Sequence, residues 1–434
     1  MPPGLELGLV FFTFLVLLGC GMAVPLAIGV PAVFYLFLQG GFDALRGLGI
    51  VSVGSMESSA LTAIPLFMLM AELLQRGGVS QRVYRGLSKL FAPLPGGLLQ
   101  TNIVGCALFS AISGSSVATA AAIGKVALPQ LIARKYDRAL SAGSLAAGGT
   151  LGILIPPSLV MIIYGAFTDT SVARLFMAGV VPGILLTLMF MVYTAVHVKL
   201  KPSTVPTEKG PESLQELFQA LADVLPFVFL IVLTFGSLYV GLATPTEAAA
   251  LGCILAVIVN IIWGKFSWLI LNISLSQTIK GAGNILFIIF SAYLFSYAMT
   301  YAGIGEEVTS YIVGLKLSKL EFFLVIFLLY TVLGCLVEGL GMIVITVPLL
   351  FPVLTHYGVD PVFFGVVLVL FVELGMITPP IGINLFVIQS IWKGKLSEVV
   401  KGTIPFHIIM FLLLFMLVLW PEIALWLPNK MKGH

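Results

Sequence analysis

The amino-acid sequence predicts an all-α polytopic membrane protein, built from two inverted repeats that each contain about five transmembrane helices and one re-entrant hairpin. Of its 434 residues, 59% are hydrophobic and only 9% are charged, whereas soluble domains carry about 25% charged residues. Several apolar runs, such as 225–242 and 404–427, approach or exceed the roughly 20 residues that cross a bilayer as a helix. None alternates with the two-residue period of a barrel strand.

Charge and cysteine content exclude other classes. The net charge of +3 is small for this length, and the basic residues lie mostly in short loops, so nucleic acid is not an expected partner and the lipid bilayer is the main environment. Cys20, Cys106, Cys253 and Cys335 lie singly in apolar segments without CxxC spacing. We expect them to be small buried hydrophobic residues and not a disulfide or metal set.

Motifs recur in order along the chain. Gly152 and Gly375 each provide the glycine of the motif L-G-x-x-x-P-P and lie 223 positions apart (375 − 152). Asp137 and Asp360, which come before them, are also separated by 223 positions. Two earlier pairs lie 225 positions apart (303 − 78): Gly78 with Gly303, and Gly114 with Gly339. This pattern predicts a first repeat over 1–200, a hydrophilic cytoplasmic linker over 201–218 and a second repeat over 219–434.

Loop charges orient the repeats, because basic residues accumulate in cytoplasmic loops. Basic residues flank the segment 94–129 on both sides, so it is expected to be a re-entrant hairpin with both ends in the cytoplasm. The flanks of the equivalent hairpin, 320–352, are poor in basic residues and fit the outside, which makes the repeats inverted. The crossings are expected at 5–21, 23–40, 56–76, 139–165 and 171–198, then at 219–242, 244–264, 281–303, 362–389 and 403–427.

Two of these crossings, 139–165 and 362–389, are broken by Gly and Pro. Unwound backbone at membrane depth is tolerated where it lines a cavity, and paired broken helices with hairpins are how many secondary transporters bind a cation and an anion. The first hairpin also supplies hydroxyls: Ser110, Ser113, Ser115, Ser116 and Thr119. Such hard oxygen ligands suit Na⁺. Close helix packing by small residues is the alternative explanation of this cluster.

Acidic residues within apolar segments are costly and often functional. Glu338 lies at the tip of the second hairpin, which favours a functional role, whereas Glu57 and Glu72 are expected to be structural or interfacial. The absence of a Walker A motif argues against ATP-driven pumping, and no catalytic pair or triad indicates an enzyme. We therefore expect gradient-driven transport with no catalytic residues.

Five stretches in order resemble one known family across nearly the whole chain. They are "AIPLFMLMAELLQRGG", "SAISGSSVATAAAIG", "GGTLGILIPPS", "GLATPTEAAALG" and "LGMITPPIGINLF". The chain resembles the large membrane subunit of tripartite ATP-independent periplasmic (TRAP) transporters of the dicarboxylate and sialic-acid type. The resemblance implies a bacterial inner-membrane location, a scaffold domain, a mobile transport domain that moves as an elevator, and Na⁺ coupling. It also implies a small four-helix membrane subunit and a periplasmic binding protein that delivers an organic anion.

The resemblance also implies site residues, with two Na⁺ sites expected. The first Na⁺ site matches Ser113, Ser115, Gly152, Ile155 and Pro157. The internal repeat then suggests Gly339, Gly375, Thr378 and Pro380 for the second Na⁺ site. Candidate substrate residues are Ser116, Glu338, Pro156 and Asn384. Many relatives look to have Asp where this chain has Glu338, so the longer side chain could shift an ion ligand or reshape the substrate pocket.

Several alternatives stay open at this point. No four additional spans precede Leu5, so the small subunit is expected to be a separate polypeptide. A stand-alone Na⁺/carboxylate symporter without a binding protein is the main alternative function. A channel would need a continuous polar path, whereas the polar groups here cluster at two places with apolar sequence on either side. The resemblance does not identify which organic acid is carried, because family members take carboxylates and sulfonates.

Overall fold

The protein is helical throughout the part of the chain that the structure, a computed structural model, describes: residues 3–431 without 56, 207, 264–265 and 336. The first half contains α1 (Pro3–Gly19), α2 (Val24–Leu45), α3 (Gly47–Gly54), α4 (Ser59–Arg76), α5 (Val79–Phe91), α6 (Leu98–Ser113), α7 (Ser116–Ala133), α8 (Arg138–Leu154), α9 (Leu159–Thr168) and α10 (Val172–Leu200). The second half contains α11 (Leu214–Tyr239), α12 (Pro245–Ile262), α13 (Trp268–Tyr301), α14 (Ile304–Gly314), α15 (Lys319–Gly334), α16 (Gly339–His356), α17 (Pro361–Met376), α18 (Ile383–Trp392), α19 (Leu396–Leu419) and α20 (Glu422–Leu425). No described residue lies in a β-strand.

Nine helical segments of the described chain are long and apolar enough to cross a membrane, which confirms the predicted fold class of a polytopic helical membrane protein. The count treats α8 and α9 as one segment, and a tenth is obtained if α3 and α4, which are bent by 51°, form one span. Exposed apolar side chains cover helices at the periphery, including Phe229 on α11 and Ile408 on α19. Such surfaces are stable in contact with lipid and not with water.

The two halves repeat one order of elements, from α5 to α10 and again from α14 to α19. Equivalent helices also begin in the same way. Asp137 accepts a hydrogen bond from the Leu140 N–H at the start of α8, and Asp360 accepts one from the Phe363 N–H at the start of α17. A side-chain oxygen at this position satisfies an amide that the first helical turn leaves unpaired. The repeat boundaries and their inversion across a membrane stay predictions.

Several helix boundaries differ from the sequence prediction. Helix α11 begins at Leu214 inside the predicted linker, because Ser213 caps it by accepting the Glu216 N–H. Helix α13 begins at Trp268 instead of 281, where Ser267 provides the same type of cap. Helix α19 covers Leu396–Leu419 and so starts and stops earlier than the predicted span 403–427. Polar capping residues therefore extend α11 and α13 beyond their apolar cores, whereas α19 begins at Leu396 without a side-chain cap.

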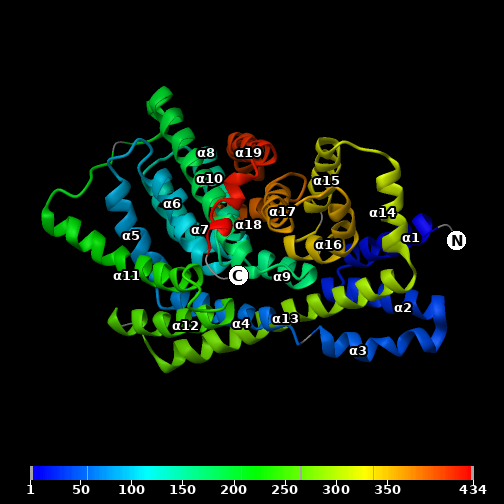
Figure 1. The fold of residues 1–434 in the computed structure, drawn as a ribbon. Helices are drawn as coiled ribbons and strands as arrows, with labels where there is room; N and C mark the ends of the chain where they lie inside the picture. Colours follow the sequence, from blue (N-terminus) through cyan, green and yellow to red (C-terminus); the bar gives the residue numbers. More distant parts are fainter. Residues whose placement is uncertain (1–2, 56, 207, 264–265, 336, 432–434) are drawn as a thin grey trace.

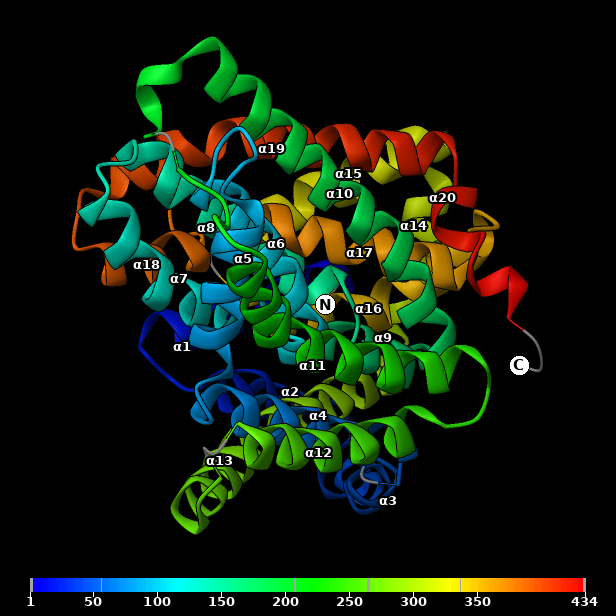
Figure 2. The ribbon, with the colours of Figure 1, turned by 90° about the vertical axis from the view of Figure 1, so that its left-hand side faces the viewer.

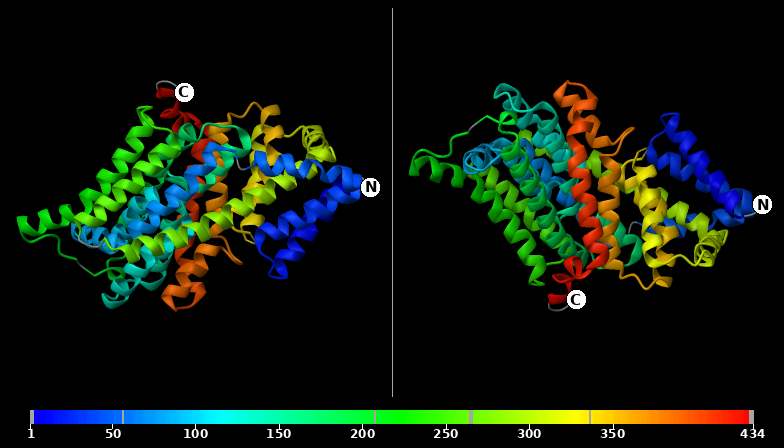
Figure 3. Two further views of the ribbon diagram at one scale, coloured as in Figure 1. Left: turned by 90° about the horizontal axis from the view of Figure 1, so that it is seen from below. Right: turned by 90° about the horizontal axis from the view of Figure 1, so that it is seen from above.

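The helices form two groups (Figure 1). We call α2, α4, α11, α12 and α13 the frame: α4 packs on α12 and α13, and α13 packs on α2. The long helix α13 runs along this layer (Figure 3). We call α6–α9 and α15–α19 the block: α8 packs on α6, α7 and α19, and α15 packs on α17. In Figure 2 the frame lies below and α19 lies at the opposite side of the block.

Helices α5 and α14 connect the frame to the block at equivalent places in the two halves, but they pack differently. Both follow a glycine with positive φ, Gly78 at 75° and Gly303 at 72°, a conformation that glycine adopts without steric cost. Helix α5 buries one face against α11, where a Cβ on Gly86 would lie 2.6 Å from the Ala220 carbonyl oxygen. Helix α14 buries only Ile304 among its described residues.

Candidate functional site

The tip of the first hairpin is docked on the break between α8 and α9. Helix α6 ends at Gly114, whose φ of 59° turns the chain back, and Ser115 caps α7 by accepting the Ala118 N–H at 3.4 Å. The Leu159 N–H, at the start of α9, donates to the Gly114 carbonyl oxygen at 3.3 Å. The unwound backbone of each element therefore helps to satisfy the other, as membrane depth requires.

Hydroxyl and carbonyl oxygens gather where this tip meets α8. The Ser113 hydroxyl hydrogen-bonds with the Thr119 hydroxyl and donates to the Ser115 carbonyl oxygen at 3.2 Å. A Cβ added to Gly152 would lie 2.6 Å from the Ser115 carbonyl oxygen and 2.7 Å from Thr119 Oγ1. The close approach of α8 to these oxygens therefore depends on glycine.

The structure thus brings Ser113, Ser115 and Gly152 together, and it adds Thr119. The sequence identifies Thr119 as one of the hydroxyl-bearing residues of the first hairpin, but the predicted first Na⁺ site does not include it. Its position four residues after Ser115 is the signal that could have assigned it, because residues four apart lie on one face of a helix.

The two remaining residues of the predicted first Na⁺ site lie in the break itself. The Pro157 carbonyl oxygen faces Gly114, where an added Cβ would lie 2.8 Å from it. The Ile155 side chain points the other way and packs against Gly183 of α10. Ile155 can therefore contribute to the tip region only through its backbone. Pro156 is buried in the break and is joined to Pro157 by a cis peptide bond.

The second break is arranged less tightly than the first. Gly375, at the end of α17, packs on Gly334, with an added Cβ 2.7 Å from the Gly334 Cα. The Cys335 thiol lies 3.2 Å from the Pro379 carbonyl oxygen, so the end of α15 faces this break. Pro380, which follows a cis peptide bond, is exposed, whereas the equivalent Pro157 is buried.

Two other residues of the predicted second Na⁺ site lie in different surroundings. The Thr378 hydroxyl donates to the Leu374 carbonyl oxygen at 2.6 Å and lies 3.2 Å from Nε2 of His407 on α19. Gly339 begins α16 and packs toward Val372 and Met376 of α17. The Thr378 hydroxyl is therefore engaged within the block, while Gly339 lies at the tip of the second hairpin.

Two of the candidate substrate residues contact each other across the halves of the chain. Nδ2 of Asn384, in the first turn of α18, donates to the Ser116 hydroxyl at 2.6 Å and to the Ala146 carbonyl oxygen at 3.3 Å. The side chain is fully buried, and its Oδ1 has no hydrogen-bond partner within the described chain. A buried carbonyl oxygen without a hydrogen-bond partner is energetically costly.

Three helix N-termini meet at one cavity of about 30 Å³ between the hairpin tips. Its lining includes Ser116, Leu159 and Gly339, which are the first residues of α7, α9 and α16. Glu338 also lines it, so the two hairpin tips face each other here. Amide groups at helix N-termini carry partial positive charge and attract anions.

A neighbouring cavity of about 260 Å³ separates the two tips from the frame. The tips contribute Ser113, Ser115 and Glu338, and the frame contributes Glu72 and Gln75 of α4 together with Gly281 and Asn284 of α13. No lysine or arginine is among its lining residues. Glu72, expected from the sequence to be structural, pairs with Arg76 at 2.8 Å but also lines this cavity. Gln75 and Asn284 were missed because α4 and α13 carry no break at these positions.

Comparison with known proteins gives the family. The family model of the tripartite ATP-independent periplasmic transporter, DctM component, matches residues 9–423. The chain belongs to this family. This DctM-family chain is 35% identical to the C4-dicarboxylate TRAP transporter large permease protein DctM of Pseudomonas aeruginosa, over 89% of this chain and 90% of that protein. It is 30% identical to the isethionate TRAP transporter permease protein DctMQ of Oleidesulfovibrio alaskensis, over 96% of this chain and 66% of that protein.

The fold of the DctM-family chain also occurs among solved structures. The Alcanivorax borkumensis YdaH transporter, whose crystal structure reveals an unusual topology, superposes with a TM-score of 0.66 at 14% sequence identity, covering 88% of this chain and 89% of that one. Membership in the family makes the chain a large permease of a TRAP transporter for organic acids, a multi-pass protein of the inner membrane. The family works with a periplasmic binding protein and a small membrane subunit.

Proposed function

We propose that this chain is the subunit of a Na⁺-coupled secondary transporter that imports an organic anion, a carboxylate or a sulfonate, delivered by a periplasmic binding protein. The observation that carries the proposal is the meeting of three helix N-termini at the cavity between the hairpin tips, beside a cluster of hydroxyl and carbonyl oxygens. The first feature suits an anion and the second suits Na⁺. The names of the two relatives, which specify a C4-dicarboxylate and isethionate, support this substrate class.

Each ion would have its own place. The first Na⁺ would be held by Ser113, Ser115 and Thr119 with backbone oxygens near Gly152. A second would be held by the Thr378 hydroxyl together with carbonyls of the break that contains Thr378 and Pro380. No lysine or arginine is among the lining residues of either cavity beside the hairpin tips. The substrate carboxylate or sulfonate would therefore depend on amide N–H groups and on bound Na⁺ for its counter-charge. Coupling follows, since the anion is bound well only after the cations have entered.

The proposed movement is an elevator motion of the block against the frame, with the repeats 1–200 and 219–434 in opposite orientations and the linker 201–218 in the cytoplasm. The cavity of about 260 Å³ supports this division, because one wall belongs to the hairpin tips and the other to α4 and α13. Sliding of the block would carry the tips past that wall and open the site to the other side of the membrane.

The proposed partners are a small four-helix membrane subunit as a separate chain and a periplasmic binding protein. Uptake of labelled C4-dicarboxylates and sulfonates into proteoliposomes that contain this chain and the small subunit tests the proposal. We expect uptake only with an imposed Na⁺ gradient and the binding protein. Uptake with Na⁺ alone would show the stand-alone Na⁺/carboxylate symporter instead, and flux that does not saturate would show a pore. Recovery of the labelled substrate from the proteoliposomes in chemically unchanged form would support transport and not enzymatic turnover.

Removal of a proposed Na⁺ ligand is expected to weaken the binding of Na⁺, so that uptake requires a higher Na⁺ concentration. Ser113→Ala and Thr378→Ala should each raise the Na⁺ concentration for half-maximal uptake about tenfold, because each removes one oxygen ligand. Ser110→Ala is the matched control, since Ser110 lies one turn earlier on α6 and its hydroxyl is bonded to the Cys106 carbonyl oxygen. An unchanged Na⁺ dependence in Ser113→Ala would exclude that residue from the site.

The carboxylate of Glu338 is expected to matter for transport. Glu338→Gln keeps the shape of the side chain but removes the negative charge from both cavities that Glu338 lines. We expect uptake to fall about tenfold, because intramembrane carboxylates that face a cavity are costly and are retained for function. Glu307→Gln on the exposed surface of α14 is the control for loss of charge. Wild-type uptake in Glu338→Gln would make Glu338 a structural residue.

A further inference from the structure

Apart from the transport site, the structure contains a large basic chamber at the junction of α5, α7 and the end of α12. It has a volume of about 840 Å³. Its charged lining residues are Arg76, Arg82, Arg85, Lys89, Arg134 and Lys209, with Glu208 as the single acid among them. Each of the six cations also pairs with a carboxylate, from Glu72, Asp223, Glu216, Glu208 or Glu212. Attraction of an anion therefore depends on the N–H donors that these pairs leave unused, and the proposed transport mechanism gives these cations no role.

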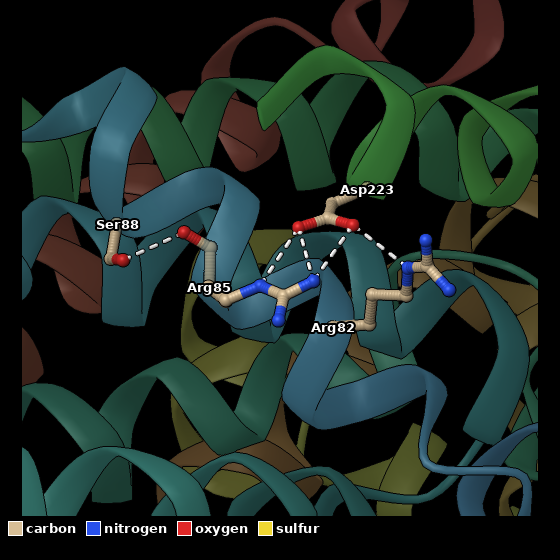
Figure 4. A network of polar contacts seen from close by, with 4 residues as sticks. All are labelled: Arg82, Arg85, Ser88 and Asp223. Atoms are coloured by element: carbon tan, nitrogen blue, oxygen red, sulfur yellow. Dashed lines mark hydrogen bonds and ion pairs between the residues drawn. The ribbon is translucent and has the colours of Figure 1, made fainter. Parts of the chain in front are cut away.

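Acidic partners hold three of these cations in place without using all of their donors. Asp223 of α11, only 3% exposed, accepts hydrogen bonds from Arg82 Nε at 2.7 Å and from Arg85 Nε at 2.9 Å. Figure 4 shows both Nη atoms of Arg82 directed away from Asp223. Glu208 holds Arg134 at 2.6 Å, and this hydrogen bond raises the pKa of Arg134 further above its usual value. The guanidinium groups are therefore positioned in advance and still have free donors.

An apolar groove begins where the chamber ends. Arg82 and Trp263 line both spaces, and the Arg82 guanidinium carbon lies 4.8 Å from the centre of the Trp263 ring. All other residues that line the groove are apolar: Ala222, Leu225, Pro226, Val228, Phe229, Val232 and Ile262. The groove has a volume of about 830 Å³ and follows α11 for about 15 Å between Ala222 and Val232.

We propose that this junction binds an anionic phospholipid, with its phosphate at Arg82 and Arg85 and an acyl chain in the groove along α11. Charge and shape together select this ligand, because the cations are continuous with a groove whose exposed side chains face the bilayer. Tryptophan is frequent at the level of lipid headgroups, and basic pockets between transmembrane helices bind anionic headgroups. A free phosphate or a soluble anion would use the chamber and leave the groove empty.

Native mass spectrometry of the full chain in a non-ionic detergent can test this site. Phosphatidylglycerol and phosphatidylcholine with identical acyl chains are titrated separately, and the fraction of protein with one bound lipid is measured. We expect phosphatidylglycerol to bind about tenfold more tightly, from the charge of the headgroup alone. Equal binding of the two lipids would overturn the proposal.

Two kinds of variant test the binding of the lipid headgroup and the binding of the acyl chain separately. Arg82→Gln together with Asp223→Asn removes the cation without leaving a buried carboxylate unpaired, and Ala222→Trp fills the groove while all arginines remain. Each should abolish the tenfold preference. Arg138→Gln is the matched control, because Arg138 also lies over a tryptophan, Trp392, at 5.4 Å but lines neither the chamber nor the groove. Loss of the preference in this control as well would overturn the proposal.

Other occupants give distinct results. Competition by glycerol 3-phosphate at concentrations similar to those of the lipid would assign the chamber to a soluble anion and overturn the proposal. If Ala222→Trp releases the co-expressed small membrane subunit while the lipid preference remains, the groove belongs to that subunit and the proposal is wrong. Retention of the small subunit with loss of the lipid preference supports the lipid.

Discussion

Gly402→Val is expected to destabilise the fold strongly. Gly402 of α19 faces Gly143 of α8, and a Cβ at position 402 would lie 1.8 Å from the Ala139 carbonyl oxygen. A Cβ at 143 would lie 2.1 Å from the Gly402 carbonyl carbon. These contacts are with backbone, which has no flexible end that can move aside, so the two helices must separate. Overpacking of this kind costs about 3 kcal/mol or more.

The measurement is the apparent melting temperature of detergent-purified protein, with the yield of monodisperse protein as a second readout. We expect Gly402→Val to lower the melting temperature by roughly 5 °C or more and the yield severalfold. Gly236→Val is the matched control, because Gly236 lies within the long helix α11 and an added Cβ meets no atom within 4 Å. Equal behaviour of the two variants would contradict the proposed close contact of α8 and α19.

Gly152→Ala is expected to abolish Na⁺-dependent uptake while the protein still folds. The added methyl group would lie 2.6 Å from the Ser115 carbonyl oxygen and 2.7 Å from Thr119 Oγ1. The tip of the first hairpin must then move away from α8, and the oxygens proposed to bind Na⁺ no longer converge. A displacement of about 1 Å in a pre-organised site is enough to lose function.

Uptake and folding must be measured on the same preparation. We expect Gly152→Ala to reduce uptake at least tenfold while its gel-filtration profile stays that of the wild type. Gly283→Ala on α13 is the control, since an added Cβ there has no neighbour within 4 Å. Wild-type uptake by Gly152→Ala would remove the first Na⁺ site from this position.

The sequence predicts the helical membrane fold and the two paired breaks because both depend on local signals. Apolar length indicates the spans, and the repeated Gly and Pro residues indicate where α8 and α17 end. The contact between Asn384 and Ser116 could not be predicted as a contact, since 268 positions separate the two residues. The roles of Gln75 and Asn284 in the cavity lining also depend on how frame and block pack. Periodicity within one helix can indicate which face is buried, but it does not identify the distant helix that packs against that face.

The two breaks also show a limit of reasoning from internal repeats. The matching spacing of the two L-G-x-x-x-P-P motifs predicts two equivalent Na⁺ sites, but Pro157 is buried and its counterpart Pro380 is exposed. The neighbours of the two breaks differ as well, since the Thr378 hydroxyl lies beside His407. A motif can be duplicated while its surroundings diverge, so the second Na⁺ site needs its own mutational test.

The unequal packing of α5 and α14 has a mechanical consequence. Arg82 and Arg85 attach α5 to Asp223 of α11, whereas α14, its counterpart, has one fully buried residue, Ile304, among those described. One end of the block is therefore pinned and the other is loosely tethered. If the block moves against the frame as proposed, α5 would resist displacement more than α14 does, so the second hairpin would meet less resistance than the first.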